Sequence, residues 1–299
     1  MNIFEHFICP ICHLPLTKID GAFKCSLGHS FDISSSGYVN LLKPGKKNNA
    51  KAGDSKEMIR ARTSFFESGA YEGISNKICE LVNELKPSLV IDAGCGEGYY
   101  TQNIAKLDTS CHVIGIDMSK FGCEHGAKVA KRNGIENLIY SVGSIFELPV
   151  DNGSADLIIN MFAPVASEEF LRALRVGGHF IIASAGIEHL NGLKAVLYDD
   201  IYKNEEKVLN YDGAKLVRCD NLKYDVKICG NEAIKNLFSM TPYYHRTSLD
   251  DKKKLDDVDE INTTIEVNFA IYRKIWAQKI RLQNLKSYFL FENFSFNST

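Results

Sequence analysis

The stretch LVIDAGCGEGYYTQNIAKL, residues 89–107, constrains the fold more than any other part of this chain. Its apolar, β-branched start is typical of a buried parallel strand. Three glycines at alternate positions, Gly94, Gly96 and Gly98, follow Asp92, and a helical pattern begins directly after them. Glycines permit positive φ and let a ligand lie against the backbone. The order strand, glycine turn, helix therefore predicts a ligand site where this strand ends.

More strand-like segments follow in alternation with helical ones. Residues 111–117 end in Asp117, and an acid at this place can accept both ribose hydroxyls of a nucleoside. The alternation predicts an α/β fold with a doubly wound parallel sheet. The glycine spacing matches neither the dinucleotide nor the phosphate-loop signature, so we expect a ligand without phosphate. The later elements are expected as strands at 138–143, 155–162 and 179–185 and a helix at 168–175, with the pair Gly177-Gly178 between this helix and the last strand.

A second cluster, CPICHLPLTKIDGAFKCSLGHSFD, lies at residues 9–32. Cys9 and Cys12 are two residues apart, and Cys25 and His29 follow with three residues between them. Four such ligands predict a closed, tetrahedral and hence structural Zn²⁺ site, with Asp20-Gly21 as a hairpin turn between the ligand pairs. A segment this short cannot bury enough apolar surface to fold alone, so metal binding would supply the missing stability.

Other interpretations of the cysteines are weaker. His13 is the alternative fourth ligand, but it directly follows Cys12 and would strain the turn; His6 is expected at the surface. A redox C-x-x-C would begin a helix in a β–α–β unit. The chain shows no signal-peptide pattern and no window of 18 apolar residues. We therefore expect a cytoplasmic protein with thiols rather than disulfides, and no membrane contact.

Charge is uneven along the chain. Residues 1–62 hold nine Lys/Arg and five Asp/Glu, a balance of +4, and the remainder holds 26 and 32, a balance of −6. A basic front on an acidic body suggests an anionic partner for the front. The lysines concerned include Lys43, Lys46, Lys47 and Lys51, and the alternative is a flexible linker that they merely keep soluble.

The glycine turn, the acidic second strand and the Gly-Gly pair together resemble the Rossmann-like class I methyltransferases that use S-adenosylmethionine (SAM). A longer series also resembles one family, the 23S ribosomal RNA guanine-N1 methyltransferases, which carry an N-terminal zinc ribbon. This series spans residues 9 to about 275 and reads CPICHLPL, GHSFDISSSGYVNLL, GDSKEMIRAR, DAGCGEGYY, MFAP, HLNGLK and MTPYYHR. The resemblance implies methyl transfer from SAM to N1 of a guanine in a 23S rRNA hairpin. It also implies zinc, RNA contact by the ribbon on rRNA or a large-subunit assembly intermediate, and leaves a homodimer open.

The resemblance divides the chain into four parts. Residues 1–45 would be an RNA-binding zinc ribbon and 46–62 a basic linker. Residues 63–275 would be the SAM-dependent domain, and the role of the extension 276–299 is not predicted. One departure concerns His245 in MTPYYHR, where the family usually has Trp, so any stacking role there is in doubt.

The resemblance places Tyr71, Gly96, Glu97 and His189 around SAM. Tyr71 would cover the sulfonium by a cation–π contact, and Glu97 would meet the ammonium of the methionine part. The alternatives are a core tyrosine, a first-turn helix acid and, for His189, a surface histidine at a helix start. The glycine turn and the second strand complete the expected SAM site: Asp92, Gly94, Gly98 and Asp117. Ser144 is expected near the adenine of SAM.

Less of the site for the target base is predicted. NMFAP, residues 160–164, ends a strand where nitrogen methyltransferases hold their target, so Asn160 and the carbonyls of Ala163 and Pro164 would orient guanine. The N1 proton must leave, but the sequence identifies no catalytic base.

Three functions remain to be separated. The first is an rRNA guanine-N1 methyltransferase. The second is a small-molecule methyltransferase with a purely structural ribbon, which predicts a closed apolar pocket. The third is an inactive RNA-binding protein, which the intact glycine turn disfavours.

Overall fold

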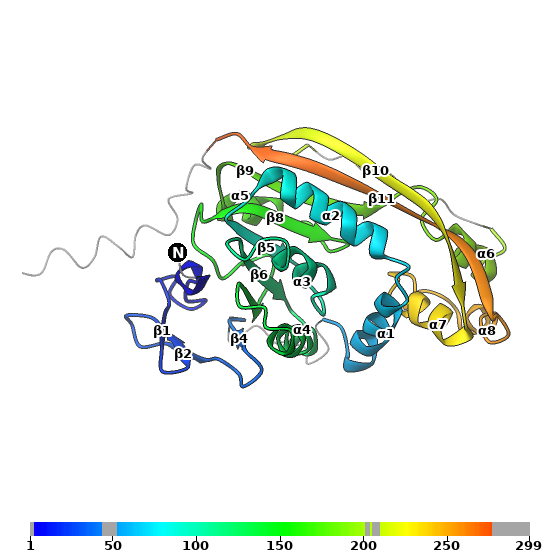
Figure 1. The fold of residues 1–299 in the computed structure, drawn as a ribbon, viewed down its shortest axis with the longest axis horizontal. Coiled ribbons are helices and arrows are strands. Elements are labelled where there is room, and N and C mark those ends of the chain that lie inside the picture. Colours follow the sequence, from blue (N-terminus) through cyan, green and yellow to red (C-terminus); the bar gives the residue numbers. More distant parts are fainter. Residues whose placement is uncertain (1–2, 44–52, 201–203, 205–209, 277–299) are drawn as a thin grey trace, which may run out of the picture.

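The computed structural model describes residues 3–43, 53–200, 204 and 210–276. Its centre is an eight-stranded sheet in the order β10-β11-β9-β8-β5-β6-β7-β4 (Figure 1). Six of these strands are parallel, as the alternating sequence predicts. They are β4 (Tyr38–Asn40), β5 (Leu89–Ala93), β6 (His112–Asp117), β7 (Leu138–Val142), β8 (Ala155–Met161) and β9 (Leu174–Ala185). We call the edge where they end the carboxyl edge, and the edge where they begin the amino edge.

A long hairpin completes the sheet. β10 (Ala214–Cys229) and β11 (Glu260–Lys274) pair antiparallel along their length, and β11 pairs antiparallel with β9. β9 itself begins at Leu174 and already includes Gly177 and Gly178. The strand expected at 179–185 is therefore longer than predicted, and its pairing with β8 skips residues 175–178, which include the two glycines.

Helices cover both faces, since successive strand residues point to opposite sides of a sheet. Val90 of β5 packs with α2 (Glu72–Leu85) and α3 (Tyr99–Ala105), whereas Ile91 packs on the face of α5 (Ser167–Ala173). α4 (Lys120–Arg132) packs on β6 and β7. The remaining helices lie toward the carboxyl edge (Figure 1): α1 (Lys56–Glu67), α6 (Asn191–Leu197), α7 (Asn231–Ser239) and α8 (Leu249–Lys253).

The N-terminal segment forms a small ribbon of three antiparallel strands. They are preceded by the 3-10 helix η1 (Ile3–His6) and comprise β1 (Thr17–Ile19), β2 (Ala22–Lys24) and β3 (Ser30–Asp32). Asp20 and Gly21 join β1 to β2 with φ of 49° and 77°, so the predicted hairpin turn is confirmed.

This ribbon is continuous with the larger core. β4 leaves the ribbon and pairs with β7, and Phe7 and Phe23 belong to the same buried cluster as Ile91. His6 is buried, against the surface position expected for it, because the loop before β8 covers it and Asp151 donates its N–H to the His6 carbonyl. The division at residue 45 stays a prediction, and the lysines of the expected linker at 46, 47 and 51 lie outside the described residues. Among the described residues, no helix is both long and apolar enough to cross a membrane.

Candidate functional site

Three cysteines and a histidine converge in the ribbon. The ligand atoms of Cys9, Cys12, Cys25 and His29 all lie within 4.8 Å of one another. Two tight turns aim them: His13 donates its N–H to the Cys9 carbonyl, and Gly28, with φ of 84°, lets the chain turn back between the second pair. The cluster contains His29 and not His13, as predicted.

The spacing of these atoms fits zinc. Cys12 Sγ and Cys25 Sγ are 3.6 Å apart, and His29 Nδ1 lies 3.5 Å from Cys9 Sγ and 3.3 Å from Cys25 Sγ. A tetrahedral Zn²⁺ with bonds of about 2.0–2.3 Å separates its ligand atoms by about 3.4–3.8 Å. Three thiolates and one imidazole leave no open position, so the site is structural.

The glycine turn is shaped by close contacts that exclude side chains. Gly98 begins α3 with φ of 89°, and a Cβ there would lie 2.1 Å from the Tyr140 hydroxyl. Gly94, with φ of 93°, would place a Cβ 2.6 Å from Cβ of Ala163. Only glycine fits these positions without moving Tyr140 or the turn after β8, which explains the spacing seen in the sequence.

Asp117 ties this turn to the next strand. Its carboxylate accepts the N–H of Gly96 at 2.9 Å and that of Ser119 at 2.7 Å. Burial raises the pKa of this carboxyl, and these backbone donors act against the rise. Each oxygen keeps a second lone pair, so the ribose contact predicted for Asp117 remains available.

Arg62 is a site residue that the sequence prediction missed. It lies on α1, which is capped at its N-terminus by Ser55, whose side chain accepts the Met58 N–H. Its guanidinium pairs with Asp54 and lies 3.8 Å from Glu97 Oε2. A Cβ on Gly96 would be 2.9 Å from Arg62 Nη1, so this cation rests directly on the glycine turn. Arg62 lies in GDSKEMIRAR, one of the motifs that resemble the family, but nothing in the spacing of this motif predicts that α1 packs against the glycine turn.

The turn carries an excess of carboxylates and several unpaired polar atoms. Burial raises the pKa of Asp92 to about 7 and that of Glu97 to about 7, although Thr101 donates to the first and Arg62 lies near the second. Buried Asp92 Oδ1, Glu97 Oε1 and the Tyr100 hydroxyl have no partner among the described residues. Unpaired buried groups are rare in native proteins and indicate a missing ligand or water. Acids facing one Arg suit the cationic sulfonium and ammonium of SAM.

Tyr71 and His189 meet although they are far apart in the chain. The Tyr71 hydroxyl lies 3.3 Å from His189 Nε2, and His189 Nδ1 accepts the Glu266 N–H at 3.2 Å. Nδ1 is therefore unprotonated and Nε2 carries the proton, which it donates to Tyr71. Burial, together with the smaller effect of the Lys194 charge, lowers the pKa of His189 to about 4. Both residues are buried, so the surface alternative for His189 is wrong.

Phe162 stands out at the end of β8. Its φ is 55°, a conformation that bulky residues rarely adopt, and 42% of it is exposed. Its ring stacks on that of His189 with centroids 5.9 Å apart, and its N–H donates to the Ala183 carbonyl. Strain of this kind is kept mainly at functional sites. The sequence signal was available, because Phe162 is the aromatic residue of NMFAP.

Asn160 has a structural role at one end of its amide, whereas its buried Oδ1 has no partner among the described residues, so the guanine contact predicted for Asn160 stays a prediction. Its Nδ2 donates to the Ala93 carbonyl at 2.9 Å and to the Pro164 carbonyl at 3.1 Å. It thereby fixes the NMFAP turn against the glycine turn, and the Pro164 carbonyl is already engaged.

Comparison with known proteins decides the family. Residues 86–255 match the family described as "Methyltransferase domain". The chain belongs to this methyltransferase family. Residues 7–51 of this methyltransferase also match the family "RlmA, N-terminal", a zinc ribbon, which agrees with the Cys₃His cluster. Its cofactors are thus SAM, as methyl donor, and structural zinc.

Three relatives match the methyltransferase at length. It is 29% identical over 194 residues to the 23S rRNA (guanine(748)-N(1))-methyltransferase of Streptomyces fradiae, covering 63% of this chain and 66% of that protein. It is 28% identical over 286 residues to YxjB of Bacillus subtilis, provisionally named a 23S rRNA (guanine-N(1)-)-methyltransferase, covering 91% and 98%. A protein of Micromonospora griseorubida with the same provisional name is 30% identical, covering 63% and 68%.

The remaining predicted residues are spread around the carboxyl edge. Ser144 follows β7, and its hydroxyl accepts the Phe146 N–H, so its adenine contact stays a prediction. Lys43 pairs with Glu147 at 3.2 Å. His245 is exposed beside Tyr244, with ring centroids 5.1 Å apart.

Proposed function

We propose that this methyltransferase transfers a methyl group from SAM to N1 of a guanine in 23S rRNA. The observation that carries the proposal is the similarity to YxjB over 91% of the chain, which includes ribbon and catalytic domain together. The charged glycine turn supports the SAM half of the reaction. The Cys₃His ribbon, joined to the sheet through β4, supports a substrate larger than a metabolite.

SAM supplies a methyl group activated by its sulfonium, so the protein mainly has to place guanine N1 in line with the S–CH₃ bond. The new N1–C bond would form as the S–C bond breaks, with the S–C electron pair going to sulfur and the N1 proton passing to a base or a chain of waters. N1 lies on the pairing edge of guanine, so the base must be unpaired or flipped out. Carboxylates at the turn, with Asp117, would hold the SAM side of this arrangement.

Phe162 would receive the target base. It is exposed at the carboxyl edge beside buried His189, and aromatic faces bind splayed-out RNA bases by stacking. His189, stacked on the opposite face of the Phe162 ring, would hold this ring in position. His189 does not act as the base in this arrangement, because its only unprotonated nitrogen already accepts the Glu266 N–H.

The small-molecule alternative fits the carboxyl edge less well. It predicts a closed apolar pocket, whereas large apolar side chains stand exposed on this edge, in the turns after the strands and at the start of α4. They are Met118, Phe121, Phe146 and Phe162. Such a face is open to a polynucleotide.

An rRNA substrate would place the protein in the cytoplasm, and the linker lysines would add phosphate contacts. The homodimer left open by the resemblance, the domain limits and the role of residues 276–299 stay predictions.

Purified, zinc-replete protein with SAM and 23S rRNA or large-subunit precursors tests the proposal. Nucleoside mass spectrometry of the product should show 1-methylguanosine at one site, and a Glu97→Gln variant should form less. Methylation of another atom, or none on any of these RNAs, would contradict it.

A further inference from the structure

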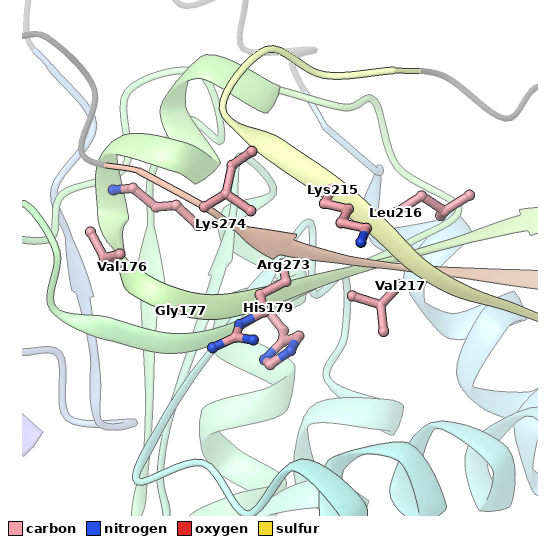
Figure 2. A pocket seen from close by; sticks show the side chains of 9 residues that line it. Val176, Gly177, His179, Lys215, Leu216, Val217, Arg273 and Lys274 are labelled. Atoms are coloured by element: carbon pink, nitrogen blue, oxygen red, sulfur yellow. The ribbon is translucent and has the colours of Figure 1, made fainter.

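Three basic residues form a row across adjacent strands at the amino edge, away from the glycine turn. In the sheet register Lys215 of β10 is opposite Arg273 of β11, and Arg273 is opposite His179 of β9. Directly opposite residues point to the same face of a sheet, so the three side chains lie side by side. Figure 2 shows Arg273 and His179 projecting together from neighbouring strands, with Lys215 across from them.

No acid offsets this row within its pocket. The pocket has a volume of about 550 Å³, and none of its nine lining residues is acidic. Neither Lys215 nor Arg273 has an ion pair with a described residue. Arg175, at the margin, pairs with Asp156, but Asp156 also accepts two backbone N–H groups, from Ser88 and Leu89. Like charges directly opposite one another destabilise a sheet, so the row costs stability that the fold alone does not explain.

Gly177 leaves space between the cations. A Cβ built there would lie 3.5 Å from Arg273 Nη2 and 3.8 Å from Arg175 Nη1. Two guanidinium groups thus flank a position without a side chain, an arrangement that suits a phosphate group, which Arg can bind through two hydrogen bonds. Burial lowers the pKa of His179, and the charges of Arg273 and Arg175 lower it further.

The ribbon reaches the same edge of the sheet. Asp151 donates its N–H to the His6 carbonyl of η1. The charge of Asp156, the partner of Arg175, acts to raise the pKa of His6. Strands of five to seven residues separate this edge from the carboxyl edge, about 17–23 Å at 3.3 Å per residue. Double-stranded RNA-binding domains contact RNA over about 16 base pairs. An RNA helix of that length is longer than the distance between the two edges.

We propose that Lys215, Arg273 and His179, with Arg175 beside Gly177, bind backbone phosphates of the RNA substrate at the amino edge. This inference rests on the proposed function. The row would hold the part of the RNA that extends away from the target guanine. Because phosphate contacts carry no sequence information, the row adds affinity and register rather than choice of base.

The test is RNA affinity at several salt concentrations for wild type and for Lys215→Gln/Arg273→Gln. Each lost phosphate contact should flatten the slope of log affinity against log salt by about 0.7–0.9, so the double variant should flatten it by about 1.4–1.8. Its SAM affinity should be unchanged, and its melting temperature should equal or exceed that of wild type. Lys215→Arg/Arg273→Lys keeps both charges and should restore the slope. Lys227→Gln is the matched control on β10, because Lys227 already pairs with Glu260.

The outcomes separate the two proposals. Equal slopes for wild type and the Gln double variant, with normal RNA methylation by both, would overturn the row and leave the proposed function standing. A flattening by about 0.7–0.9 in the single variant Lys227→Gln would also overturn it, because the effect would then be one of general charge. A wild type that neither binds nor methylates RNA would remove the proposed function itself.

Discussion

At the scale of single residues, the site is a set of polar groups whose behaviour is fixed by burial. Glu97, Asp92 and His189 are each less than a tenth exposed, so water does not stabilise their charged forms. The acids therefore have raised pKa values and the histidine a lowered one. The charge state of His189 makes its assignment testable through the pH dependence of stability.

His189 should make stability depend on pH. Its pKa is about 4 in the folded chain, whereas an unfolded histidine titrates at about 6.5. Between these values only the unfolded state binds the proton, so the free energy of unfolding falls as pH falls. The advantage of wild type over His189→Gln should shrink by about 2 kcal/mol between pH 7.5 and pH 5.

Denaturant unfolding of both proteins at the two pH values measures this. The opposite contribution of Asp92 and Glu97, whose raised pKa values favour the folded state as pH falls, is common to both proteins and cancels. A difference that does not change with pH would mean that His189 is not held neutral.

Asp117→Ala should weaken SAM binding by about 1–3 kcal/mol, because it removes an acceptor for ribose and releases the N–H of Gly96. Asp156→Ala is the control: Asp156 also accepts two backbone N–H groups, but at the amino edge. Calorimetry should show normal SAM affinity for the control. Equal losses in both variants would indicate a general loss of structure rather than a ribose contact.

Phe162→Ala should lower methylation of RNA and spare SAM affinity. Base–aromatic stacking contributes about 1–3 kcal/mol, so kcat/KM for RNA should fall by roughly 5- to 150-fold. Phe162→Tyr keeps the stacking face and should retain most activity. Comparable losses in Tyr and Ala variants would argue against stacking.

At the scale of elements, the sequence predicts the turns, ligand sets and helix starts that depend on residues close together in the chain. The Asp20-Gly21 turn, the Cys₃His set and the strand–turn–helix around Gly94 each depend on neighbours in sequence. β4, the β10–β11 hairpin and the placement of Arg62 over Gly96 depend on pairings between distant segments, which no short pattern encodes. The row of Lys215, Arg273 and His179 could not be predicted from the sequence for the same reason, because it forms only when β9, β10 and β11 pair.

The zinc site stabilises one such element. Protein purified without chelators should hold about one zinc per chain, and Cys25→Ser should lose it. Because Phe7 and Phe23 pack with the sheet core and β4 pairs with β7, hydrogen exchange should rise in residues 3–43 and also along β7. β5 and β8 should stay protected, and SAM should still bind. Zinc-free wild type with full protection of the ribbon would contradict a structural metal.

At the scale of the whole molecule, the ribbon and the methyltransferase domain share one core, and candidate functional residues lie at both the carboxyl edge and the amino edge of the sheet. The carboxyl edge carries the glycine turn, Asp117 and Phe162. The ribbon continues through β4 toward it, while η1 packs beside the amino edge, where Arg273 lies. An enzyme built in this way suits a folded RNA that is held at several points while one base is presented.

The most direct test of this account is primer extension on 23S rRNA from cells with and without the gene. A methyl group on N1 blocks the pairing edge of guanine, so reverse transcriptase should stop one nucleotide before the target. The account predicts one strong stop that disappears when the gene is deleted, returns with wild type and returns more weakly with Asp117→Ala. Identical stop patterns with and without the gene would contradict it.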